Sequence, residues 1–489
     1  MPSTWAYWVT REVDARSAGL PGMTGWKSRL RGIFAGAVMG LVVHGAALAA
    51  PMAEPATPAS HSAAMSTTSR ATATDRTGTP APTVADGVKQ APAGDGTSGR
   101  PATPLPPVTP PPAPFLTEAP TLGPSPEIGV MTMLPGEIFW ERFGHDAIVV
   151  VDPATREATS YNFGFFDLDE PDFTARFVRG DMRYQLVALP VDRDLAVYET
   201  EGRGVSIQWL DLPAGDARRL AATLAENARP ENARYRYDYF LDNCSTRVRD
   251  AIDRALHGRL RSQLEGRSQG NTYRSEAMRL ASPAFWMWLG FDIGLGPAAD
   301  QPLALWNEAF VPMRLSAALR DVAHADGRPV VRSEHEVLPH RLPPEPQERP
   351  QRWWLWALWG LVVGGALAWA GHRYPRATTA MALPFWLLCG AVGSLLLFLW
   401  FGTEHRFAWG NHNLFLLSPL TWFLLAGGVR VLRGRAPGAW FNRMLVAVAA
   451  LAAIGLFAHW LPLAPQRNAH WIALLLPIHL GLLAGLRRN

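Results

Sequence analysis

Five long apolar segments dominate the C-terminal part of the chain, each separated from the next by a short polar stretch. They lie near residues 353–370, 380–401, 412–429, 441–461 and 470–486. Each segment is close to the length that a helix needs to cross about 30 Å of hydrocarbon. We therefore predict five transmembrane helices rather than the buried helices of a soluble core.

The loops between these segments differ in their arginine content. The loops 371–379 and 430–440 and the C-terminal tail are rich in arginine, whereas the loops 402–411 and 462–469 have one arginine apiece. Arginine-rich loops tend to stay in the cytoplasm. With five spans, this pattern places the C-terminus inside the cell and everything before Trp353 outside it.

The first 126 residues divide into a leader and a tether. In the leader, residues 1–50, three basic residues precede an apolar run at 32–50 that ends in an Ala-x-Ala sequence. This order is typical of an export signal, and the run is also long enough to remain as an uncleaved anchor. Residues 51–126 are rich in Pro, Ala, Thr, Ser and Gly. Such a segment buries too little apolar surface to fold, so we predict a disordered tether.

Residues 127–348 show the alternation of strands interspersed with helical periodicity. Strands are predicted near 128–134, 145–151, 159–165, 182–189 and 203–210, and helices near 171–179, 214–228 and 245–257. The second strand is apolar along most of its length and is therefore expected at the centre of a sheet. The pattern predicts an α+β domain, followed by an all-α membrane domain over 353–489.

Charge and cysteine content narrow the possible partners. The 489 residues carry a formal net charge of +4, and no basic stripe interleaved with aromatics is present, so we predict no nucleic-acid partner. The chain has two cysteines, of which Cys389 lies in a membrane segment. Exported proteins tend to pair their cysteines, and Cys244 has no partner in its own domain. We therefore expect Cys244 to be a free thiol.

The position of Cys244 favours a chemical role. Val248, Ala251, Ile252 and Ala255 recur at helical spacing after it, so the thiol lies at or just before a helix N-terminus. Unpaired N–H groups and the positive end of the helix dipole favour a thiolate there, and the same groups can stabilise an oxyanion. The alternative is a small buried hydrophobic residue, but its polar neighbours argue against a core position.

A nucleophilic thiol needs a base, which is most often a histidine. His145 follows a turn at Gly144 and begins the predicted central strand. His257 lies too far along the helix of Cys244 and is better explained as a partner of the helix dipole. The remaining histidines of the domain precede the membrane in a polar, proline-rich stretch: His324, His335 and His340. His145 is therefore the candidate base.

Several stretches together resemble one family. "FGHDAIVV", "SYNFGFFDLDEPDF", "YRYDYFLDNCSTRVRD", "WMWLGFDIGLG", "FVPMRL" and "TEHRFAWGNHNLFLLSPL" are similar to segments of the Lnb-type bacterial lipoprotein N-acyltransferases. The resemblance covers most of residues 127–430 and does not include the leader or the tether. It implies a periplasmic domain of the permuted papain-like type, as in the NlpC and lecithin retinol acyltransferase folds, followed by membrane helices.

The resemblance also implies roles for individual residues. Cys244 matches the nucleophile and His145 the base, and Asn162 occupies the place of the third, orienting residue on the next strand. Asn162 fits a turn residue at the end of a strand equally well. The neighbours of the nucleophile are expected to support it or the oxyanion: Asn243, Ser245 and Thr246.

The activity implied is transfer of an acyl chain from a phospholipid, through a thioester on Cys244, to the amine of a diacylglyceryl-cysteine lipoprotein. The enzyme is expected in the bacterial inner membrane, with its catalytic domain facing the periplasm and no metal or cofactor. Four polar residues in or beside the loop 402–411 are expected to bind lipid headgroups or the amine, or to anchor the interface: Glu404, His405, Asn411 and Asn413. The segment 282–296 fits either the membrane interface or the core.

Two other functions are compatible with parts of the pattern. A papain-like peptidase or amidase acting on peptidoglycan uses the same Cys and His pair, but it does not need five membrane spans. A non-enzymatic membrane binding protein is the second alternative, and it does not need both Cys244 and His145.

Overall fold

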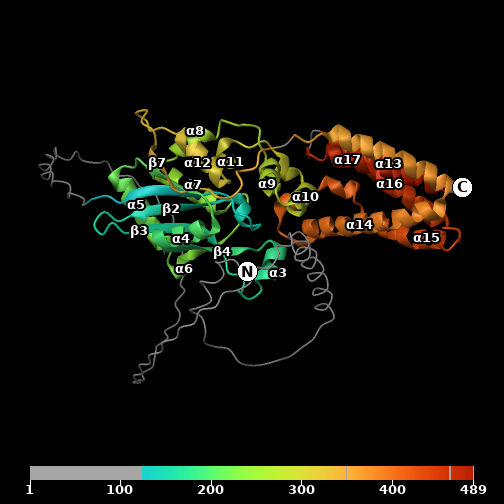
Figure 1. The fold of residues 1–489 in the computed structure, drawn as a ribbon, viewed down its shortest axis with the longest axis horizontal. Helices are drawn as coiled ribbons and strands as arrows, with labels where there is room; N and C mark the ends of the chain where they lie inside the picture. The colour runs from blue at the N-terminus through green and yellow to red at the C-terminus, as the bar shows by residue number, and fades with distance from the viewer. Residues whose placement is uncertain (1–123, 349, 462–463, 488–489) are drawn as a thin grey trace, which may run out of the picture. The chain divides into compact units, whose positions relative to one another are not determined.

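The structure is a computed structural model that describes residues 124–487, apart from residues 349, 462 and 463 (Figure 1). The predicted leader and almost all of the predicted tether lie outside the described residues. In the described part of the chain, a mixed α/β region precedes five long apolar helices. This arrangement confirms the predicted α+β class followed by a helical membrane part.

A seven-stranded antiparallel sheet forms the centre of the first region (Figure 1). Its strands are β1 (Glu127–Met133), β2 (His145–Val151), β3 (Ala158–Phe165), β4 (Arg183–Pro190), β5 (Val205–Leu210), β6 (Arg234–Arg236) and β7 (Val331–Leu338). Their order is β6-β4-β3-β2-β1-β5-β7. All five predicted strands are confirmed, and β2 has the central position expected from its apolar sequence.

The two strands that the sequence pattern missed lie at the sheet edges. β6 has only three residues, and β7 has the sequence VRSEHEVL, most of which is exposed. Charged side chains are common on edge strands because they discourage pairing with another chain. The stretch containing His335 was predicted as a polar approach to the membrane. That interpretation was wrong, because His335 pairs with Ile207 of β5.

Helices cover both faces of the sheet. On one face, α5 (Ala214–Asn227) and α7 (Cys244–Ala255) pack against Ile128, Val130 and Ile148. On the other face, the unpredicted helix α4 (Val191–Glu201) packs through Tyr198 against Met131 and Val149. The alternation of β1 and β2 divides their side chains between these two cores. The predicted helices are confirmed as α3 (Phe173–Arg179), α5 and α7.

Short helices that no periodicity predicted follow α7, and one of them, α9, takes part in a second apolar cluster. They are α8 (Arg259–Leu264), α9 (Tyr273–Ala281), α10 (Phe285–Gly294), α11 (Leu305–Glu308) and α12 (Pro312–Arg320), and the four-residue α6 (Pro230–Ala233) precedes α7. Phe240, Tyr273 and Phe310 pack there against Phe407, which follows the second membrane helix. The cluster therefore joins the sheet domain to the membrane part.

Among the residues that the structure describes, five helices are long and apolar enough to span a membrane, as predicted. They contain α13 (Trp353–Arg373), α14 (Pro375–Gly402), α15 (Trp422–Leu432), α16 (Ala439–His459) and α17 (Ala469–Leu486). The third span runs over His412–Leu432 and begins with short 3₁₀ turns before α15. The protein is therefore a multi-pass membrane protein.

Candidate functional site

Cys244 is the first residue of α7, and its neighbours cap that helix. The Asn243 side chain accepts a hydrogen bond from the Thr246 N–H at 2.9 Å, and the Thr246 hydroxyl accepts one from the Asn243 N–H at 2.8 Å. This reciprocal capping box satisfies two donors at the helix start. Two of the three predicted support residues, Asn243 and Thr246, therefore hold the backbone that carries the thiol.

The third predicted support residue, Ser245, connects α7 to the sheet. Its hydroxyl oxygen lies 2.7 Å from Oδ2 of Asp146 and 2.8 Å from the carbonyl oxygen of Ala309. The other carboxyl oxygen of Asp146 accepts a hydrogen bond from Thr132 at 2.8 Å. Asp146 is fully buried. Because Asp146 follows His145 directly, this contact brings the start of β2 to the start of α7.

The Cys244 thiol is 9% exposed and packs among apolar side chains. Burial raises its pKa to about 12, and the negative charge of Asp146 adds to this effect. Backbone N–H groups of Asp146, Ser245 and Cys244 itself hydrogen-bond to the sulfur and lower the pKa, but by less. The direction of this pKa shift is opposite to the one expected from the helix terminus, because loss of water around the sulfur has the larger effect.

A hydrogen-bonded chain runs from His145 into α4. The His145 Nε2 and Asn162 Oδ1 are 3.0 Å apart, and the Asn162 amide nitrogen donates to Oδ2 of Asp194 at 2.8 Å. Asn162 and Asp194 are almost completely buried. Since a carboxylate only accepts, Asp194 turns the NH₂ of Asn162 toward itself and the carbonyl toward His145. His145 Nε2 then donates, which leaves the lone pair on Nδ1.

His145 is held as a neutral imidazole. Burial lowers its pKa to about 4, and the positive charge of Arg203 acts in the same direction, while the hydrogen bond with Asn162 opposes both. A neutral imidazole is the form that accepts a proton. Neither Asp194 nor Arg203 was a candidate from the sequence, because α4 was not predicted and both contacts depend on the folded sheet.

The thiol and the imidazole lie at the same end of the sheet and belong to different faces. The partners of His145 lie toward α4, whereas α7 packs on the opposite face. Gly164, two residues after Asn162 on β3, has a φ of 92°, and a Cβ placed on it would lie 3.8 Å from the Cys244 Cβ. The sulfur itself meets the N–H of Asp146 at the start of β2.

Two of the residues expected to bind headgroups line a surface pocket. Glu404 forms an ion pair with Arg236 of β6. The Nε2 of His405 donates to the Phe177 carbonyl at 3.1 Å, so its Nδ1 accepts from the Tyr239 hydroxyl at 3.2 Å. Both side chains face a pocket of about 370 Å³ between the sheet domain and the loop after α14.

The other two residues do not face that pocket. The Asn411 amide donates to the carbonyls of Ile293, Gly294 and Leu295 at 2.8–3.0 Å, and the Asn413 amide donates to Ile293 at 3.0 Å. These carbonyls are the unpaired acceptors at the end of α10. Since both asparagines are buried, the structure assigns them to docking this helix, and the expectation that they bind headgroups was wrong.

The segment 282–296 combines both roles that the sequence left open. At the start of α10, Phe285 is 70% exposed and Trp286 is also exposed. Near its end, Asp292 is fully buried and accepts hydrogen bonds from His470 at 2.8 Å and Trp471 at 2.9 Å, both at the start of α17. One end of α10 is thus free for an interface, and the other is part of the core.

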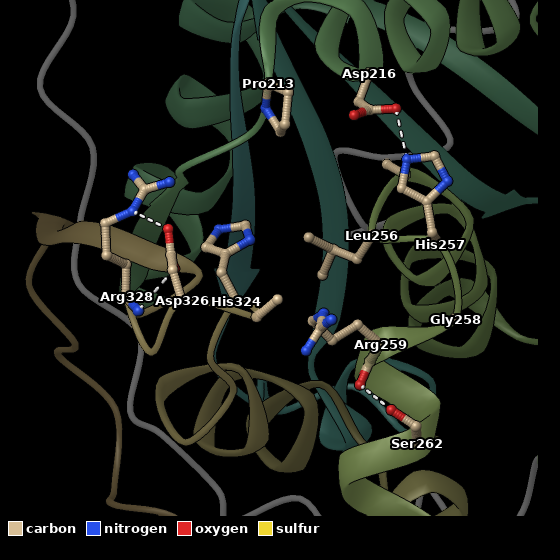
Figure 2. A pocket seen from close by; sticks show the side chains of 12 residues that line it. Pro213, Asp216, Leu256, His257, Gly258, Arg259, Ser262, His324, Asp326 and Arg328 are labelled. Carbon is tan, nitrogen blue, oxygen red and sulfur yellow. Dashed lines mark hydrogen bonds and ion pairs between the residues drawn. The ribbon is translucent and has the colours of Figure 1, made fainter.

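A second cavity of about 520 Å³ lies at the opposite end of α7 from the thiol (Figure 2). His257 lines it, and its Nε2 lies 3.0 Å from Oδ1 of Asp216. His324 also lines it. None of the predicted site residues faces this cavity. Among the residues that the structure describes, no group of side chains has the arrangement of a metal site.

Two family models match the chain. Residues 125–277 match the model described as the Lnb N-terminal periplasmic domain, and residues 352–486 match the Lnb transmembrane domain. Together the two ranges cover more than half of the 489 residues, in the order that the sequence pattern predicted. No curated protein and no solved structure matches the chain.

Proposed function

The chain belongs to the Lnb family of lipoprotein-processing membrane proteins, and from this we propose that it is a cysteine-dependent lipoprotein N-acyltransferase. The acyl donor is a membrane phospholipid, and the acceptor is the N-terminal amine of a diacylglyceryl-cysteine lipoprotein. The observation that carries the proposal is the chain from Asp194 through Asn162 to a neutral His145, beside the end of the sheet where the thiol lies.

In the first half of the reaction, the sulfur of Cys244 attacks the ester carbonyl of the phospholipid, and the thiol proton passes to Nδ1 of His145 at the end of the sheet where both residues lie. The backbone N–H groups around the sulfur stabilise the oxyanion that forms. The ester C–O bond then breaks, and the His145 imidazolium protonates the departing glycerol oxygen. A thioester on Cys244 and a lysophospholipid result.

In the second half, the amine of the lipoprotein attacks the thioester. His145 removes the proton that the amine loses, the C–S bond breaks, and the same proton returns to the sulfur. The products are an N-acylated lipoprotein and the resting thiol. Because both Cys244 and His145 are neutral at rest, each half begins and ends without a buried charge.

We also propose a role for each part of the chain. Residues 127–348 form the catalytic domain, of the permuted papain-like type that the resemblance implies, and residues 353–489 form the membrane domain. The leader exports the catalytic domain to the periplasm. The periplasmic side agrees with the distribution of arginines between the loops and with the family description of residues 125–277. We assign the protein to the bacterial inner membrane.

The test uses a strain depleted of its own lipoprotein N-acyltransferase. It expresses the wild type, Cys244→Ser, or Cys389→Ser as the control for loss of a cysteine elsewhere. Mass spectrometry of a lipoprotein's N-terminal peptide should show one added acyl chain with the wild type and Cys389→Ser, and none with Cys244→Ser. Altered peptidoglycan fragments with diacylated lipoproteins would instead support a wall hydrolase. Unchanged lipoproteins and peptidoglycan would support a binding protein.

A further inference from the structure

The pocket of about 370 Å³ beside the membrane loop is a candidate ligand site in its own right. One wall comes from the turn between β6 and α7, and the other from Glu404, His405 and Arg406, with Trp409 at the margin. None of the three hydrogen-bonded residues His145, Asn162 and Asp194 lines it. The proposed reaction leaves it without a role.

The pocket lies close to the nucleophile. Tyr237 lines it, and Cε2 of that ring lies 3.4 Å from the position that a Cβ on Gly164 would take. The Cβ of Cys244 lies 3.8 Å from the same position. The ring of Tyr237 therefore lies between the pocket and the thiol. A lipid whose ester reaches Cys244 has its headgroup only a few bonds away, which is within the reach of this pocket.

Two ion pairs join the sheet domain to the membrane loop at the pocket, and the sheet domain supplies the cation in one pair and the anion in the other. Arg236 of the sheet domain pairs with Glu404 of the membrane loop, and Asp238 of the sheet domain pairs with Arg406 of the membrane loop at 3.2 Å. Three of the four side chains are more than half exposed. Exposed ion pairs contribute little to stability, so exchanging their partners for a ligand costs little free energy.

An aromatic side chain beside these charges is held in one orientation. The rings of Tyr239 and His405 are stacked with their centres 5.9 Å apart, and their hydrogen bond links them as well. The Nε2 of His405 is in turn tied to the Phe177 carbonyl. A fixed aromatic face is attractive to a cationic ligand group.

We propose that this pocket binds the zwitterionic headgroup of the phospholipid acyl donor. Arg236 and Arg406 bind the phosphate, and Glu404 and Asp238 bind the ammonium group. A ligand with both charges replaces both ion pairs at once, whereas the acceptor amine has no phosphate and matches only the acidic half. The inference rests on the proposed function for the identity of the lipid.

The binding test uses the full chain with Cys244→Ala, so that no acyl transfer occurs. Native mass spectrometry in detergent compares retention of phosphatidylethanolamine, phosphatidylglycerol and a diacylglyceryl-cysteine peptide with a free amine. Phosphatidylethanolamine should be retained about tenfold better than the other two. Equal retention of phosphatidylethanolamine and phosphatidylglycerol would overturn the inference, as would preferential retention of the peptide.

Two further variants separate the halves of the pocket. Glu404→Gln should abolish the preference for phosphatidylethanolamine over phosphatidylglycerol, whereas Arg406→Gln should weaken retention of both lipids several-fold. Glu348→Gln is the matched control, because Glu348 is equally exposed and makes only a 4.0 Å contact with Arg467. It should change neither property. If Glu404→Gln and Arg406→Gln act alike on every lipid, the pairs only join the two parts of the chain.

The two proposals fail separately. If the Cys244→Ala protein selects phosphatidylethanolamine while the wild type transfers no acyl chain, the pocket assignment stands and the acyltransferase does not. If the wild type transfers acyl chains equally well from both lipids, and Glu404→Gln does not change this, the acyltransferase stands and the pocket assignment does not.

Discussion

Two buried aspartates support the candidate site, one on the side of His145 and one on the side of Cys244, and they act differently. Asp194 contacts Asn162, which contacts His145, so its effect on the base passes through an oriented amide. Asp146 lies next to the thiol, fastens α7 through Ser245, and raises the pKa of Cys244 by its charge. One carboxyl group thus orients the base, and the charge of the other adds to the burial that raises the pKa of the nucleophile.

The comparison shows that residue type alone does not define a role. Burial raises the pKa of both carboxyl groups, to about 7 for Asp146. What differs is the neighbour on the active-site side: an amide that transmits orientation for Asp194, and a sulfur that responds to charge for Asp146. Substitutions at and around Asp194 and Asp146 should therefore have different effects.

The largest effect is expected from removing the base itself. His145→Ala should lower acyl transfer about 10³-fold, because the group proposed to take the thiol proton is removed. Single-turnover formation of the Cys244 thioester measures the first step directly. His257→Ala, at the far end of α7, is the control and should retain full activity. Full thioester formation by His145→Ala would show that another group removes the proton.

The neutral thiol should be visible in its alkylation rate. With a pKa of about 12, the thiolate fraction of Cys244 rises about tenfold per pH unit, so alkylation by iodoacetamide should rise about 100-fold from pH 7 to pH 9. The measurement uses a Cys389→Ala background, in which Cys244 is the only cysteine.

Replacing Asp146, the carboxyl group beside the thiol, should change the alkylation rate of Cys244. Asp146→Asn removes a negative charge, so the thiol pKa should fall and alkylation at pH 7 should increase several-fold. Asp194→Asn should leave the rate unchanged. A wild-type rate that does not vary between pH 7 and pH 9 would mean that the thiol is already ionised at rest.

The carboxylate behind the base should affect turnover rather than thiol reactivity. In Asp194→Asn, the new side chain no longer forces the amide of Asn162 into one orientation, so part of the His145 population takes the other tautomer. We expect kcat to fall about 10- to 100-fold with little change in KM. Asp192→Asn, exposed on the same helix, is the control.

A spectroscopic readout distinguishes orientation from simple loss of stability. The ¹⁵N chemical shifts of His145 should report Nε2–H in the wild type and a mixture of tautomers in Asp194→Asn. An unchanged tautomer together with reduced kcat would contradict the role assigned to Asp194.

The smallest effect is expected from substituting Gly164, which lies on the strand of Asn162 and beside Cys244. Gly164→Ala introduces a Cβ at a φ of 92°, 3.4 Å from the Tyr237 ring and 3.8 Å from the Cys244 Cβ. We expect a loss of stability of about 1–2 kcal/mol together with reduced thioester formation. Gly270→Ala has a similar φ of 80° and nothing within 4 Å, so it should lose stability without losing thioester formation. Equal activity in both variants would show that Gly164 does not shape the site.

Much of the fold followed from local patterns. The strand at 145–151 was predicted with its observed limits, and the five membrane segments were placed within a few residues, because apolar period and length are properties of a continuous stretch. β7 was missed because a charged edge strand has no apolar alternation. α4 was missed although it carries Asp194.

The candidate site was predicted only in part. His145, Asn162 and Cys244 were proposed from motif and position, and all three lie at one end of the sheet. Asn411 and Asn413 were misassigned because a polar loop looks the same whether its amides bind a ligand or cap a distant helix. The partners that distinguish these cases, at residues 293–295, lie more than 100 positions away.

The order of amino acids was sufficient to establish five membrane spans, an α+β domain before them, and an unpaired cysteine at the start of a helix. Each of these depends on composition and spacing within one stretch of chain. The protonation state of the thiol, the tautomer of His145 and the pocket beside the membrane loop followed from the folded chain alone. They depend on how much water packing removes, and on which remote polar atoms it brings within hydrogen-bonding distance.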